Sequence, residues 1–267
     1  MTIILPKRPK RDVAAAYREF ANSGKLAMLN GRYDLDERTD AMMDFIRRHV
    51  DFKAGHRVLD IGCGDARLLR SLPQMAFRAG TVLTEEERAV LTVEDWGIHF
   101  IAGSFADLPR VVPGPFDRIV ANGCLPIIAS TSAAEKTIGA MVELLNPGGK
   151  IWLGELFSKA NPDEIHKIRF NSKWSALANA RRRHGLVFAA KFARHIVKHW
   201  RRASEIVERR REFGPWWFIQ PSEIPSLAQR FGLIVDGIWD CEKETGEPFY
   251  ADHGRFSVLL RKPENSQ

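Results

Sequence analysis

The sequence has few of the features that mark secreted, metal-binding or membrane-spanning proteins. Its 267 residues include only three cysteines, and Cys63, Cys124 and Cys241 are widely spaced without a C-x-x-C pair. Such a pattern argues against a disulfide framework and against a zinc site. No apolar run is long enough to cross a membrane, and residues 1–8 lack the apolar core and cleavage site of a signal peptide. We therefore expect a cytoplasmic protein without a metal centre.

Negative charge is scarce in one part of the chain. The formal net charge is +7 at pH 7, and residues 159–211 contain 15 Lys and Arg but only four Asp and Glu. The rest of the chain is therefore negative overall, and the basic character belongs mainly to this segment. No basic run is interleaved with several aromatic residues and no RNA-binding motif is present, which argues against a nucleic-acid partner.

The most informative stretch is R-V-L-D-I-G-C-G-D-A-R-L-L, residues 57–69. Its apolar and β-branched residues 58–61 predict a strand buried on both faces. Gly62 and Gly64 then predict a tight turn into a helix, and because glycine has no Cβ, a ligand can lie directly against the backbone there. The start of that helix offers free N–H groups, and Asp60 supplies a carboxylate at the carboxyl end of the strand.

Two classes of cofactor site use such a turn. A dinucleotide site requires the pattern G-x-G-x-x-G, but Arg67 stands where the third glycine belongs. The other pattern, Asp-x-Gly-x-Gly-x-small with Ala66 as the small residue, resembles the first motif of the class I S-adenosylmethionine (SAM) methyltransferases. This resemblance implies that Asp60, Gly62 and Gly64 bind SAM. A strand–helix turn without a ligand is the structural alternative.

The resemblance covers residues 50–156 and 221–262. A predicted helix at 133–145 leads into L-N-P-G-G, residues 145–149, which fits the L-x-P-G-G landmark of the same family. The resemblance implies an α/β fold with a Rossmann-like, doubly wound sheet of seven mostly parallel strands and an antiparallel last strand. We expect strands at 58–61, 77–83, 151–156, 234–238 and 256–261, with two more beginning near His99 and Pro115.

Three regions are expected on this basis. Residues 1–50 form N-terminal helices, at 13–21 and 36–50, that cover the cofactor site. Residues 51–156 and 221–262 form the SAM-binding domain. Residues 157–220 form a basic helical lid inserted after the fifth strand, beside the cleft where open α/β sheets bind ligands.

The resemblance also implies contacts to the nucleoside part of SAM. The acid that binds the ribose in this family would fall near Val82 or Leu83, and neither is acidic. Glu85 is the nearest substitute, although an acid in the first turn of a helix also complements the helix dipole. Ser104 stands where the family commonly has an Asp facing the adenine, and Phe105 is placed to lie against the ring.

Two further residues are candidate SAM contacts. Asn122 follows the fourth strand, where the family contacts the methionine part of SAM, although Asn before Gly is also a common turn former. Tyr33 lies between the two N-terminal helices and is a candidate cap over the cofactor.

The lid has three possible roles. Phe188, Phe192, Ile196 and Trp200 recur at helical spacing, so one stripe is apolar while the remaining surface is basic. A lid or homodimer helix, a field that attracts an anionic substrate, and weak contact with RNA or an anionic membrane surface all fit this pattern.

The expected chemistry is methyl transfer to a small molecule. The protein aligns donor and acceptor for in-line displacement, and an alcohol acceptor also needs a base. Glu155, at the end of the fifth strand, His166 in the lid and His253 before the last strand are the candidate bases. The resemblance implies a SAM-dependent methyltransferase acting on an oxygen or nitrogen of a small, anionic or sugar-type metabolite. The alternative is a catalytically degenerate partner subunit with the same fold.

Overall fold

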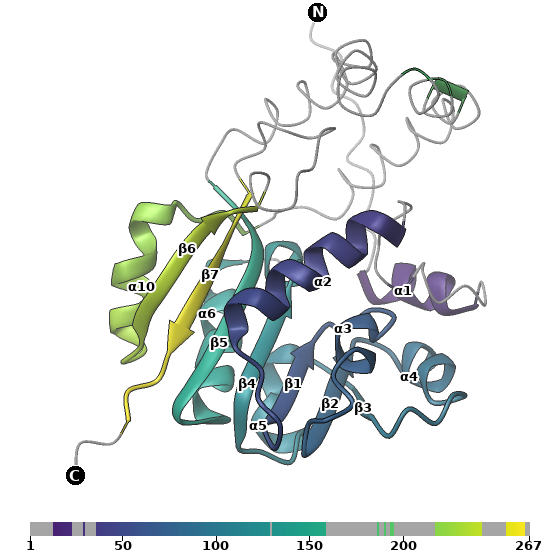
Figure 1. Ribbon diagram of the computed structural model, residues 1–267, viewed down its shortest axis with the longest axis horizontal. Coiled ribbons are helices and arrows are strands. Elements are labelled where there is room, and N and C mark those ends of the chain that lie inside the picture. Colours follow the sequence, from purple (N-terminus) through teal and green to yellow (C-terminus); the bar gives the residue numbers. More distant parts are fainter. Residues whose placement is uncertain are drawn as a thin grey trace, which may run out of the picture.

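The computed structural model describes residues 13–22, 29, 36–128, 130–158, 186, 190, 193–194, 217–241 and 255–264. Figure 1 shows the arrangement of the helices and strands. In chain order they are α1 (Val13–Asn22), α2 (Asp36–Val50), β1 (Arg57–Ile61), α3 (Arg67–Arg70), β2 (Phe77–Val82), α4 (Glu85–Leu91), β3 (His99–Ala102), η2 (Phe105–Asp107), α5 (Leu108–Val111), β4 (Phe116–Asn122), η3 (Leu125–Ile127), α6 (Thr131–Glu143), β5 (Leu145–Phe157), η4 (Pro221–Glu223), α10 (Ile224–Arg230), β6 (Ile234–Asp240) and β7 (Arg255–Arg261).

The strands form one seven-stranded sheet in the order β3-β2-β1-β4-β5-β7-β6. β1 pairs in parallel with β2 and β4, and the outer pairs β2–β3 and β4–β5 are also parallel. β7 is antiparallel to both β5 and β6. The predicted fold class, with its antiparallel last strand, is therefore confirmed. The strand order reverses between β1 and β4, which is where open α/β sheets place their ligands.

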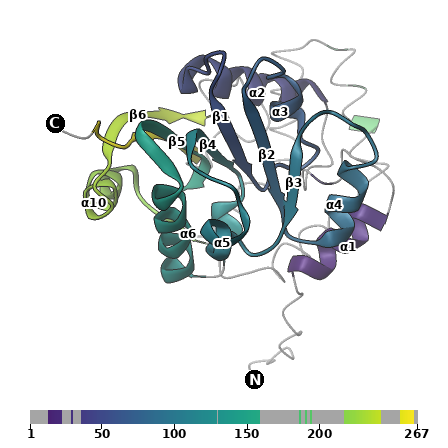
Figure 2. The same cartoon turned by 90° about the horizontal axis from the view of Figure 1, so that it is seen from below.

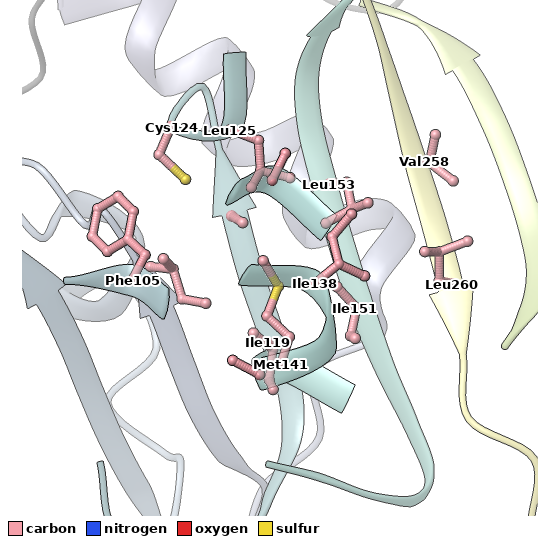
Figure 3. Packing of buried hydrophobic residues seen from close by; sticks show 14 of the residues in the cluster. Phe105, Ile119, Cys124, Leu125, Ile138, Met141, Ile151, Leu153, Val258 and Leu260 are labelled. Atoms are coloured by element: carbon pink, nitrogen blue, oxygen red, sulfur yellow. The ribbon is translucent and has the colours of Figure 1, made fainter. Parts of the chain in front are cut away.

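Helices cover both faces of the sheet (Figures 1 and 2). On one face, α2, α3 and α4 contribute buried side chains that pack with Val58, Val120 and Trp152 of the strands. On the other face, α5, α6 and α10 pack against the alternate strand residues. Figure 3 shows Ile138 and Met141 of α6 beside Ile119, Ile151 and Leu153 on this second face. Because both faces are covered, β1 and β4 are buried at most positions, including the polar Asp60 and Arg118.

Local capping determines where several helices begin. Thr84 precedes α4 and accepts a hydrogen bond from the main chain of Glu87, as its N-cap position predicts. Ser130 caps α6 in the same way, accepting from Ala133 at 3.1 Å. The helix predicted after the glycine turn is short, because Ala66 has a left-handed backbone (φ 59°) and α3 spans only four residues.

The N-terminal helices lie on the same side of the sheet. α1 packs against α4, and α2 crosses the sheet face over β4 and β5 (Figure 1). Phe45 of α2 is fully buried, with its ring centroid 5.2 Å from that of Trp152. Tyr33 lies outside the described residues, and so do most of residues 157–220. Within the described part of the chain, no helix combines the length and apolar character of a membrane span.

The C-terminal end of α2 is anchored by a buried arginine. Arg118 of β4 is 6% exposed. Its guanidinium donates to the carbonyl oxygens of Val50 (2.9 Å), Asp51 (3.1 Å) and Asp117 (2.8 Å). Because the last carbonyl groups of a helix lack partners within the helix, this guanidinium both satisfies them and fixes α2 to the sheet.

Replacing Arg118 with Met should test this anchor, because Met keeps an aliphatic side chain and removes every donor. With three carbonyl groups left without these donors, we expect the free energy of unfolding to fall by about 3 kcal/mol. Chemical denaturation of both proteins measures the difference. Arg110→Met, on the exposed side of α5, is the control and should cost less than about 0.5 kcal/mol. Equal stability of Arg118→Met and wild type would contradict the anchor.

Candidate active site

The turn after β1 has a backbone that few residues can adopt. Gly62 (φ 67°), Gly64 (φ 55°) and Ala66 (φ 59°) are all left-handed. A Cβ atom at Gly62 would lie 2.9 Å from Cβ of Cys124 and 3.4 Å from the ring of Phe105. Glycine is therefore required at 62 by both conformation and space. Ala66 is fully buried in the core, so the packing of its methyl group offsets the strain of its backbone.

Neighbouring elements hold this turn in place. The Gly62 N–H donates to Oγ1 of Thr81 (3.3 Å), and the Cys63 N–H donates to the Thr81 carbonyl (3.0 Å). The buried Asp65 forms an ion pair with Arg67 at 3.2 Å, and Arg67 also reaches Asp40 of α2 at 3.1 Å. Arg67, which stands where the dinucleotide motif has its third glycine, therefore links α2 to the turn.

Asp60 is a buried carboxyl group at the carboxyl end of β1. It is 6% exposed. Burial, with a smaller contribution from the nearby charge of Asp65, raises the pKa of Asp60 to about 8. A positively charged ligand would compensate this carboxylate and favour its ionised form. SAM carries a positively charged ammonium group and a positively charged sulfonium, so the Asp60 carboxylate fits SAM as a ligand.

The buried acid after β2 is Glu87 rather than Glu85. The Glu85 side chain is 68% exposed and forms an ion pair with Arg88 at 2.6 Å. Glu87 is 2% exposed, and its Oε2 accepts from N and Oγ1 of Thr84, each at 3.0 Å. Burial raises the pKa of the Cys63 thiol, with smaller contributions from the charges of Asp60 and Glu87, so Glu87 lies near the glycine turn. The spacing Thr84-x-x-Glu87 is a capping-box pattern that marks this residue in the sequence.

Of the two predicted adenine contacts after β3, Phe105 lies at the glycine turn that follows β1. Phe105 is 7% exposed and its ring approaches Gly62, and Figure 3 shows it on the same side of the core as Cys124. Ser104 is exposed directly beside it. The structure therefore brings Phe105, Gly62 and Cys124 together. The Phe105 ring lies at the turn, which is where it must be to contact a ligand bound there.

A second group of polar residues lies where β4 and β5 end. The Asn122 amide donates to Oε2 of Glu155 (3.3 Å), and the Trp152 indole donates to Oδ1 of Asn122 (3.5 Å). Glu155 is 3% exposed and is paired with Arg255 at 2.5 Å. A Cβ at Gly154 would overlap Oδ1 of Asn122, so glycine is required there for this contact.

Three predicted site residues fall in parts of the chain that the structure does not describe. His166, His253 and Tyr33 are not among the described residues. Across the described part of the chain, no group of His, Cys, Asp and Glu side chains is arranged to hold a metal ion.

Curated relatives match part of the chain, and no protein-family model matches it. The ubiquinone biosynthesis O-methyltransferase of Chromobacterium violaceum is 29% identical over 131 residues, 46% of this chain and 53% of that protein. The protein of the same name from Xanthomonas euvesicatoria pv. vesicatoria is 31% identical over 108 residues, 39% of this chain and 44% of that protein. The chain thus spans about half the length of these curated relatives.

Solved structures match nearly the whole chain. One is a chain of the complex between the Haloferax volcanii Trm112 methyltransferase activator and a methyltransferase (TM-score 0.59, 13% identity, 95% of this chain and 99% of that chain). Another is the magnesium protoporphyrin IX methyltransferase ChlM of Synechocystis PCC 6803 with bound SAM (TM-score 0.55, 13% identity, 98% and 100%). The [4+2]-cyclase SpnF also matches (TM-score 0.57, 16% identity, 96% and 97%).

These similarities confirm the resemblance at the level of the fold: the chain has the fold of the class I SAM-dependent methyltransferases. Its matched relatives are O-methyltransferases by name. One structure with this fold is a cyclase, and a fold by itself does not determine a reaction. The reaction has to be argued from the site.

The buried Asp60 carboxyl should make the ligand-free protein less stable as the pH rises. Its folded-state pKa of about 8 lies above the value of about 4 in an unfolded chain. Between these values the folded state holds a proton that the unfolded state has lost. The stability present below about pH 4 is therefore lost progressively as the pH rises to about 8.

Asp60→Asn mimics the protonated carboxyl and should remove most of this loss of stability with rising pH. At pH 8 we expect it to be more stable than wild type by roughly 2–5 kcal/mol, measured by chemical denaturation of the ligand-free proteins between pH 4 and 9. Asp95→Asn, at an exposed loop position, is the control. Parallel pH profiles for Asp60→Asn and wild type would show that the Asp60 carboxylate ionises without a cost.

Proposed function

We propose that this protein transfers a methyl group from SAM to a hydroxyl oxygen of a small molecule. The observation that carries the proposal is the turn after β1, where the left-handed Gly62 and Gly64 follow the buried Asp60 carboxyl. The names of the curated relatives support an oxygen rather than a nitrogen acceptor. An anionic, sugar-type or aromatic alcohol is the class of acceptor that we propose.

Bound SAM supplies a methyl group activated by a positively charged sulfur, and the chain's own residues bind and orient it. Asp60 balances the positive charge of the methionine part. Gly62 and Gly64 allow close contact with the backbone. Glu87, the buried acid after β2, accepts hydrogen bonds from the ribose hydroxyls, and the Phe105 ring lies against the adenine.

Alignment and proton removal complete the proposed reaction. Holding the acceptor oxygen about 3–3.5 Å from the methyl carbon contributes roughly 7–11 kcal/mol of the barrier reduction. Glu155 is the proposed base because it lies at the carboxyl end of β5 in contact with Asn122. The N-terminal residues 1–50 and the basic residues 157–220 are proposed to cover the cofactor and the acceptor, respectively.

The second candidate function is a partner subunit that has lost catalysis. Two residues favour it, since Leu83 and Ser104 stand where the resembled family has acids. The buried Glu87 opposes it, because it supplies an acid after β2 from the next helix. The two candidates differ in whether the chain binds SAM.

Calorimetric titration with SAM and with S-adenosylhomocysteine tests the proposal. We expect micromolar or tighter binding to wild type, which corresponds to about −8 kcal/mol or below. Glu87→Gln should weaken binding about tenfold through loss of a charged acceptor, while Gln can still complete the capping box. Glu85→Gln, two residues away and exposed, is the matched control and should bind like wild type.

The titration has three other outcomes. No binding of either ligand to wild type would overturn the proposed activity in favour of the partner subunit. Weaker binding by Glu85→Gln alone would show that Glu85, rather than Glu87, contacts the ribose. Unchanged binding by both variants would show that neither Glu85 nor Glu87 contacts the ribose.

A further inference from the structure

The Asp60 carboxyl group is buried without a partner. β1 places this residue between Gly80 of β2 and Val120 of β4, and neither neighbour carries a polar side chain. Asp60 is 6% exposed, and within the described part of the chain no hydrogen bond or ion pair reaches its carboxyl oxygens. A carboxylate in such surroundings takes up a proton rather than remain charged.

Solvent still reaches the Asp60 oxygens. An oxygen with neither a partner nor accessible surface would be a sealed, unsatisfied atom, and among the described residues neither oxygen of Asp60 is one. The carboxyl lies at the end of β1, where the strand order reverses between β1 and β4 and where open α/β sheets bind ligands. It therefore combines a small accessible area with hydrogen-bond acceptors that a ligand can fill.

The arginines at the glycine turn are paired with a different acid. Oδ2 of Asp65 lies 3.2 Å from Nη2 of Arg67 and 3.8 Å from Nη2 of Arg70, and Arg67 also pairs with Asp40 of α2. Asp60 experiences repulsion from this group, because burial and, to a smaller extent, the Asp65 charge raise the pKa of Asp60 to about 8.

Three other described titratable side chains lie near this position, and each is neutral or acidic. Burial raises the pKa of the Cys63 and Cys124 thiols, and the Asp60 charge adds to both effects. Burial also raises the pKa of Glu87, against hydrogen bonds from Thr84. Glu87 is therefore a second buried acid that could carry a proton, and an experiment has to separate it from Asp60.

We propose that Asp60 releases a proton when the cofactor binds and takes the ammonium group of the methionine part in its place. This inference rests on the proposed function. The Asp60 O–H bond breaks, the proton passes to solvent, and the carboxylate accepts hydrogen bonds from the ammonium. An ammonium group offers three N–H donors, whereas a sulfonium offers none, so the unfilled acceptors of Asp60 select the ammonium.

Cofactor affinity should therefore rise with pH below about pH 8. In the ligand-free protein Asp60 has a pKa of about 8, and a bound positive charge lowers this pKa. Between the lowered value and about 8, binding removes one proton from the protein, so affinity rises about tenfold per pH unit, or about 1.4 kcal/mol. The gain is lost as the pH falls, because Asp60 is then protonated in both states.

Calorimetric titration at pH 6.5 measures the released proton directly. At this pH the α-amino group of the free ligand, with a pKa of about 8, stays protonated. The binding enthalpy is measured in buffers of different ionisation enthalpy, and its slope gives the number of protons released. We expect about one proton for wild type with SAM and with S-adenosylhomocysteine, because both carry the ammonium. 5′-Methylthioadenosine, which keeps the nucleoside and lacks the ammonium, should release none.

Two substitutions assign the proton to one acid. Asp60→Asn should release no proton and bind S-adenosylhomocysteine with a constant affinity from pH 5.5 to 7.5, whereas the wild-type affinity rises about tenfold per pH unit. Glu87→Gln should bind more weakly but still release about one proton. Asp95→Asn, at an exposed loop position, is the control and should match wild type. If Asp60→Asn does not fold, the wild-type pH dependence, Glu87→Gln and 5′-methylthioadenosine decide the question.

Several results would overturn the inference. Binding to wild type without proton release would show that Asp60 is already ionised, and proton release by Asp60→Asn, or its loss in Glu87→Gln, would assign the proton to another group. Release with SAM but not with S-adenosylhomocysteine would assign the charge to the sulfonium. Failure of wild type to bind either ligand would instead overturn the proposed function, so the two failures are distinguishable.

Discussion

The close approach of the β1 turn to the chain after β4 is the constraint on which the site depends. Gly62 meets Cys124 across a space too small for a methyl group, so β1 and β4 can come together at their carboxyl ends only with glycine there. That contact lies at the point where the strand order reverses between β1 and β4. It also brings Phe105 beside the same turn, so three separate segments of the chain meet around one backbone position.

Two buried carboxyl groups at this end of the sheet have opposite surroundings. Asp60 has a pKa raised to about 8 by burial and by Asp65, so it is neutral until a positive charge arrives. Glu155 already has a positive partner in Arg255. Asp60 is thus suited to respond to a cationic ligand, whereas Glu155 is already paired with a cation of the protein. Environment rather than residue type sets the two roles.

Much of the fold follows from local sequence signals, whereas several site residues depend on distant contacts. The strand before Gly62 and the cap at Thr84 are readable because turns and caps involve neighbouring residues. The strand predicted to begin at 151 begins at Leu145 instead, so residues 145–149 belong to β5. Which of the three glutamates after Thr84 is buried depends on how α4 packs against the sheet, so the sequence does not distinguish the buried Glu87 from the exposed Glu85. The pairing of Glu155 with Arg255 joins residues 100 positions apart, and no local pattern indicates it.

The left-handed turn at Gly62, Gly64 and Ala66 has a consequence for how a ligand binds. Hydrogen bonds donated to Thr81, the ion pair of Asp65 with Arg67 and the buried methyl group of Ala66 hold this turn in its left-handed form. A molecule that binds there does not have to order the loop, so association carries little loss of conformational entropy. Affinity at this position is then governed by desolvation and charge, and the ligand binds to a preformed site.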